Sequence, residues 1–103
     1  MLIITTSSIP GKTLIPLGLV RGSTIQTVNA VRDIGAGLKT LIGGELTKYN
    51  EMMDKARQIA TDRMVDEARR LGADAIVGVR FSSASIMQSA AEIMAYGTAV
   101  KFE

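Results

Sequence analysis

The feature that most constrains this chain is a helical pattern that runs without interruption over residues 44–72. Apolar residues recur at steps of three or four, which places them on one stripe of a helix with 3.6 residues per turn. These positions are Leu46, Tyr49, Met53, Ala56, Ala60, Met64, Ala68 and Leu71. Glu45 falls in the first turn, where the helix dipole favours an anion, and Gly72 suits the left-handed position after a helix end. The pattern predicts one continuous helix over 43–70.

The length of this helix limits what it can pack against. About 26 residues with a rise of ~1.5 Å make a helix of about 39 Å. A compact domain of this chain length has a radius of gyration of about 13 Å, so the helix is as long as the domain is wide or extends beyond it. Two interpretations stay open: a core helix that lies across a sheet, or a helix that also contacts other subunits.

The rest of the chain alternates extended stretches with turns. Strands are predicted at 2–6, 13–28, 74–82 and 92–102, with a connection of small residues over 82–91. Pro10 and Gly11 fit the centre of a type II turn, and Pro16, which lacks a ladder donor, marks a sheet edge or a bulge. Asp33 is a suitable N-cap for a short helix over 33–42. The 103 residues are predicted to form a single α+β domain, a mostly antiparallel sheet with one short and one long helix packed on one face.

The last two predicted strands are apolar on both faces, which is typical of strands that are covered on both sides. In a regular alternation, Val79 and Phe81 lie on the face of 74–82 opposite to Ile76. One face of 92–102 carries Ile93, Ala95 and Ala99, beside Ile76 of the preceding strand. One helix layer covers only one face of a sheet, so this patch is expected to contact a neighbouring subunit. The sequence therefore predicts a homo-oligomer whose interfaces use the C-terminal strands and part of the long helix.

Composition narrows the function classes. The chain has neither cysteine nor histidine, so it lacks the nucleophile–base pairs of Ser–His and Cys–His enzymes and the usual ligands of zinc and copper. No catalytic residue and no metal ligand is identified. The 12 basic and 10 acidic residues are interspersed, and two Tyr and two Phe make no stacking platform, so nucleic-acid binding is not expected. No stretch approaches the roughly 18 apolar residues of a membrane span, so no membrane contact is expected and the predicted location is cytoplasmic.

Three stretches of the sequence, IGGELTKYNEMMDKAR, EARRLGADAIVGVRF and EIMAYGTAV, resemble the YbjQ-like family of small bacterial and archaeal proteins. The similarity runs along nearly the whole chain. The resemblance implies an α+β subunit of the YbjQ-like, dodecin-subunit-like kind that assembles into a ring, typically a homopentamer. It implies no established catalytic residue, cofactor or ligand, and the label of the family is heavy-metal binding.

Function is predicted at the level of class. The leading hypothesis is a non-enzymatic homo-oligomer that binds a metal or a small ligand, with the cofactor unknown. The alternative is a small enzyme or carrier whose site forms between subunits. The candidate residues for such a site lie at the start of the long helix and are Gly43, Gly44, Glu45 and Tyr49.

Overall fold

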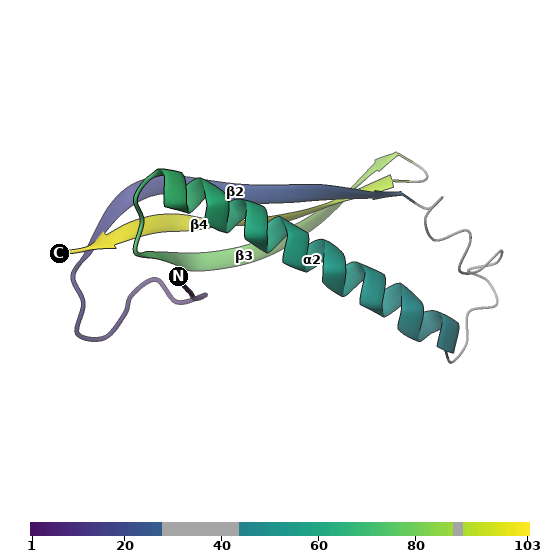
Figure 1. Cartoon of the computed structure of the whole chain (residues 1–103), viewed down its shortest axis with the longest axis horizontal. Coiled ribbons are helices and arrows are strands. Elements are labelled where there is room, and N and C mark those ends of the chain that lie inside the picture. Colours follow the sequence, from purple (N-terminus) through teal and green to yellow (C-terminus); the bar gives the residue numbers. More distant parts are fainter. Residues whose placement is uncertain (28–43, 88–89) are drawn as a thin grey trace.

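The computed structural model describes residues 1–27, 44–87 and 90–103, with the backbone alone at 44–49. The chain forms β1 (Leu2–Ile3), β2 (Leu14–Thr27), α2 (Gly44–Arg70), β3 (Ala75–Met87) and β4 (Ala90–Phe102). Figure 1 shows one layer of sheet with α2 along one face, in a molecule that measures 53 × 25 × 16 Å. The predicted α+β class is confirmed. The short helix predicted over 33–42 and the predicted helix start at Gly43 lie outside the described residues.

In the described part of the chain, the sheet has four strands in the order β1-β3-β4-β2. β4 pairs antiparallel with β2 on one side and with β3 on the other, and β1 adds a short parallel pair through Leu2↔Ala75 and Ile3↔Ile76. The sheet is therefore mixed, with antiparallel pairing along most of its length. β2 is an edge strand with a register shift between Pro16 and Gly18, as the proline predicts.

α2 is continuous over its 27 residues, as the apolar pattern predicts. It ends in a Schellman motif: Gly72 has a φ of 76°, its N–H donates to Arg69 O at 3.0 Å, and the N–H of Ala73 donates to Ala68 O at 3.1 Å. Fully buried positions of the helix begin at Ala56, and its first turns extend away from the sheet (Figure 1). The helix thus packs on the sheet through its C-terminal half.

The closest approach of the two layers is at Gly22 of β2. A Cβ atom on Gly22 would clash with Met64 N and Ala60 O, so only hydrogen fits beneath the backbone of the helix. Three alanines with no exposed surface line this side of α2: Ala56, Ala60 and Ala68. Arg63 Nη1 donates to Ser23 O at 2.6 Å and ties the helix to β2 at the same place. Small residues on both layers therefore set the distance between them.

The face of β4 that α2 covers is the one predicted to contact another subunit, and that prediction is wrong. Ala95 and Ala99 have no exposed surface, and Ile93 is 4% exposed, because all three belong to the core under the helix. β4 also has a strand on each side, so it offers no edge for pairing. The C-terminal strand is the centre of the subunit.

Two boundaries of strands also differ from the sequence prediction. β1 ends at Ile3, although Ile4 N–H still donates to Ile76 O at 3.0 Å. Residues 82–91, predicted as a connection, are mostly strand, because β3 continues to Met87 and β4 begins at Ala90. The side chains there are small and alternate weakly, so the structure comes from pairing with β4 and not from a local pattern.

The face of the sheet away from α2 is covered only in part by the described residues. At one end, residues 1–13, which we call the N-terminal arm, pack Ile4 and Ile9 against a small second core around Val77 and Val100. The remainder, which we call the open face, carries Leu19, Arg21, Ser23 and Ile25 of β2 and Glu92, Met94, Tyr96 and Thr98 of β4. Leu19 is 64% exposed and Ile25 is 57% exposed.

We expect Gly22→Ala to lower the free energy of unfolding by about 1–3 kcal/mol, because the added methyl group must push the backbone of α2 off β2. Urea denaturation followed by circular dichroism measures the change. Thr27→Ala, at an exposed position of the same strand, is the control and should change stability by less than about 0.5 kcal/mol. Equal effects of the two substitutions would show that the close approach at Gly22 does not constrain the fold.

Candidate functional site

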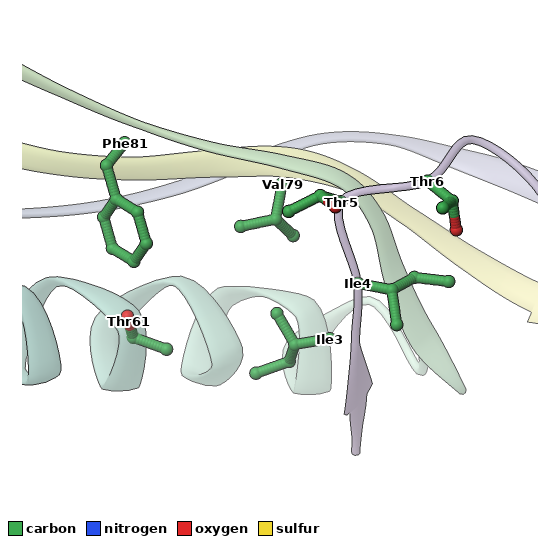
Figure 2. A pocket seen from close by; sticks show the side chains of 7 residues that line it. All are labelled: Ile3, Ile4, Thr5, Thr6, Thr61, Val79 and Phe81. Carbon is green, nitrogen blue, oxygen red and sulfur yellow. The ribbon is translucent and has the colours of Figure 1, made fainter.

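A pocket lies beside α2, where the N-terminal arm runs along the outer side of β3. It has a volume of about 500 Å³ and is lined by Ile3, Ile4, Thr5, Thr6, Thr61, Val79 and Phe81. Figure 2 shows that Ile3 of β1, Thr61 of α2 and Phe81 of β3 lie around one space. Small-molecule sites typically have about 300–1,000 Å³, so a pocket of this size can hold a small ligand.

A bulge in β3 places Phe81 in this pocket. Gly78 and Val79 together face the single Gly97 of β4, and Gly78 has a φ of 61°, the left-handed conformation of a G1 bulge. The extra residue shifts the alternation of β3 by one, so that Val79 and Phe81 join Ile76 on the side of α2. The strict alternation assumed from the sequence separates them from Ile76 and is wrong beyond the bulge. A glycine inside an apolar strand is the signal that could have revealed the shift.

The N-terminal arm forms the second wall of the pocket and is held there by hydrogen bonds to β3. Val79 N–H donates to Ile4 O at 3.0 Å. Arg80 Nη1 donates to Thr5 O at 2.9 Å and to Val79 O at 2.8 Å. The guanidinium of Arg80 is thus engaged with backbone carbonyls of the arm and of its own strand, and it is not among the lining residues.

The polar atoms of the pocket belong to threonines. Thr61 Oγ1 donates to Arg57 O at 2.8 Å, one turn earlier in α2, and Thr6 Oγ1 donates to Ser8 O at 3.0 Å. Both hydroxyl hydrogens are therefore used within the protein, and the oxygens keep lone pairs that can accept. Since no charged side chain lines the described pocket, its chemistry suits binding by shape and apolar contact.

The pocket differs from the site predicted at the start of the long helix. Gly43 lies outside the described residues. Gly44, Glu45 and Tyr49 lie in the first turns of α2, whose side chains are not part of the described structure. The described lining of the pocket includes none of them. A site between subunits near Glu45 and Tyr49 therefore stays a prediction, and α2 contributes to the pocket through Thr61 instead.

The donor atoms available for a metal follow from composition and from the described structure. The whole chain contains no Cys and no His. Within residues 1–27, 50–87 and 90–103, whose side chains are described, no three His, Cys, Asp or Glu side chains are grouped so that they could hold a metal ion. The described helix α2 is also too polar to cross a membrane.

Comparison with known proteins identifies the family. A YbjQ family model, described as "Putative heavy-metal-binding", matches residues 1–103. The UPF0145 protein of Clostridioides difficile (strain 630) is 58% identical over an alignment of 104 residues, which covers 100% of this chain and 93% of that protein. The UPF0145 protein of Clostridium novyi (strain NT) is 54% identical over 101 residues, 98% of each chain.

A solved structure supports the fold. The crystal structure of a protein of unknown function from Pediococcus pentosaceus ATCC 25745, assigned to the DUF74 family, matches with a TM-score of 0.71 over 100% of this chain and 98% of that chain. Its sequence identity is 18%, so this likeness concerns the fold alone. The resemblance found in the sequence is confirmed by the family match and by the curated relatives, and the chain belongs to the YbjQ (UPF0145) family.

Proposed function

We propose that this protein is a non-enzymatic homo-oligomer that binds a small ligand and whose subunits join edge to edge in a closed ring. The observation that carries the assembly is a pair of unpaired strand edges. β2 pairs with β4 alone among the described strands. On the other side of the sheet, β1 pairs with β3 at Ala75 and Ile76, and backbone hydrogen bonds to the N-terminal arm continue to Gly78 and Val79. Residues 80–87 have no described backbone partner on their outer side. Long unpaired edges are templates for a further strand.

The two edges differ, and this favours a ring. The β2 edge carries Pro16 and the register shift beside it, whereas the outer part of β3 consists of Arg80 followed by small and apolar residues. A contact between β2 of one subunit and β3 of the next uses two different surfaces, and such contacts repeat until the ring closes. A twofold dimer would pair like edges and leave the other edge of each subunit unpaired. We propose five subunits in the ring, because the family resemblance implies a homopentamer.

The open face supports the same proposal. Leu19 and Ile25 expose more than half of their surface there, and Met94 and Tyr96 beside them are only partly buried. Apolar patches of this kind mark protein interfaces more often than they occur on monomers. The first turns of α2, which extend away from the sheet in Figure 1, offer a second surface within reach of a neighbour.

The donor atoms of the chain favour an organic ligand over a soft metal. Heavy metals with soft character bind thiolates, thioethers and imidazoles. This sequence has neither Cys nor His, and none of its six Met lines the described pocket. The described pocket is lined by aliphatic, aromatic and threonine side chains, which coordinate such ions poorly. We therefore propose an organic ligand for this member, although the family is described as heavy-metal-binding.

We expect the wild-type protein to be oligomeric and Leu19→Lys to be monomeric, because the substitution buries a charge in an apolar contact. Size-exclusion chromatography with light scattering at micromolar concentration measures the mass. Leu71→Lys is the matched control, since Leu71 is 47% exposed at the C-terminal end of α2, and it should leave the mass unchanged. A stable wild-type monomer under these conditions would contradict the ring.

Metal content gives an independent test. We expect protein purified without chelator to carry no stoichiometric zinc, copper or nickel, also after each ion is added and the excess removed, because the chain offers no thiolate or imidazole ligand. Native mass spectrometry measures the bound mass per subunit. One metal ion per subunit or per ring, retained through buffer exchange, would restore the heavy-metal assignment for this protein.

A further inference from the structure

We propose that the pocket between the N-terminal arm, β3 and α2 binds a neutral aromatic molecule that carries one O–H or N–H donor, of the phenol or indole class. This deepens the proposed function, on which it rests for the existence of a small ligand, by giving the ligand a site and a chemical class. Three properties of the pocket lead to the class: an exposed aromatic wall, the absence of charge in its described lining, and the Thr61 and Thr6 hydroxyl groups, whose hydrogens are already donated within the protein.

The aromatic wall is Phe81. Its ring reaches from β3 toward α2 and remains 53% exposed, whereas Val79 behind it is 5% exposed and is part of the core (Figure 2). Ile3 closes the space from the side of the arm. An aromatic ligand would cover Phe81 and gain both apolar contact and the offset-stacked or edge-to-face geometry that aromatic pairs prefer.

The lack of charge in the described lining selects a neutral ligand. None of the seven lining residues is ionisable. The guanidinium of Arg80, which lies between the lining residues Val79 and Phe81 in β3, is engaged by backbone carbonyls: Arg80 Nη1 donates to Thr5 O and Val79 O. A charged ligand would lose its hydration in the pocket without gaining a counter-charge, which is costly.

The Thr61 and Thr6 hydroxyl groups favour a ligand that carries a hydrogen-bond donor. The Thr61 and Thr6 hydroxyl hydrogens are committed to Arg57 O and Ser8 O, so these oxygens can act toward a ligand only as acceptors. Thr61 stands on α2 on the side of the pocket that faces Phe81 (Figure 2). A ligand of this class would contact Phe81 with its ring and donate its single O–H or N–H to Thr61 Oγ1.

Indole is the probe that tests this proposal most directly. The chain contains no tryptophan, so the fluorescence of indole can be followed without interference from the protein. We expect saturable binding at one site per subunit. Phe81→Ala should weaken it about tenfold through the lost aromatic contact, and Thr61→Val about fivefold through the lost acceptor. Neither side chain is fully buried, so both variants should fold, and circular dichroism verifies this.

Matched controls separate the pocket from unspecific binding. Leu71→Ala, remote from the pocket on the exposed end of α2, should leave the affinity for indole unchanged. Benzoate, an aromatic anion of similar size, should bind at least about tenfold more weakly than indole, because its charge is not compensated. Equal affinity for benzoate, affinity unchanged in Phe81→Ala, or no saturable binding of indole would each overturn the proposal.

Two outcomes distinguish this proposal from the ring. If Leu19→Lys is monomeric and still binds indole, even with lower affinity, the lining residues of one subunit are sufficient for binding. If indole does not bind and Phe81→Ala lowers the mass measured by light scattering, the pocket is a subunit contact. That second result overturns the ligand assignment while it leaves the ring in place.

Discussion

The rest of the structure depends on the contact between the backbone of α2 and Gly22. Because no side chain separates the two layers there, the helix is held close over β2, and three alanines with no exposed surface, at 56, 60 and 68, line the contact. The helix covers β2 and the adjacent β4 with its C-terminal half, while its first turns run beyond the sheet (Figure 1). A helix held in this position cannot also cover the outer side of β3. That uncovered side is where Phe81 and the pocket lie.

The bulge at Gly78 decides what the uncovered side contains. Without the extra residue, Phe81 would lie on the other face of the sheet; with it, the ring lies on the face of α2 but beyond the reach of the helix. Leaving about half of a phenyl ring in water forgoes roughly 1 kcal/mol of burial free energy. A ligand or a partner that covered the ring would gain this burial free energy on binding. The bulge thus turns Phe81 to the side of α2 and leaves an exposed apolar surface there, and bulges beside functional sites commonly re-aim a side chain in this way.

The sequence predicted those elements whose signal is local. The stripe of apolar residues along α2, the glycine at its C-terminus and the edge position of Pro16 each depend on neighbours in the chain, and each is confirmed. Predictions that depended on which face of the sheet each strand residue occupies were wrong. A single bulge reverses inside and outside for every later residue, so the sequence placed Phe81 on the wrong face and gave no reason to expect a pocket. The core role of Ala95 was also missed, since two apolar faces do not tell which one the helix covers.

The positions of the two proposed surfaces make assembly and ligand binding compatible. Leu19 and Ile25 lie on the open face, whereas Phe81 and Thr61 lie on the side of α2, so a neighbour that covers the former does not fill the pocket. The shared element is β3. A strand from the next subunit that pairs with residues 80–87 would run directly beside Phe81 and add a wall to a pocket that one subunit leaves open on that side. Ring closure would then raise the affinity for the ligand, and by linkage the ligand would stabilise the ring by the same free energy.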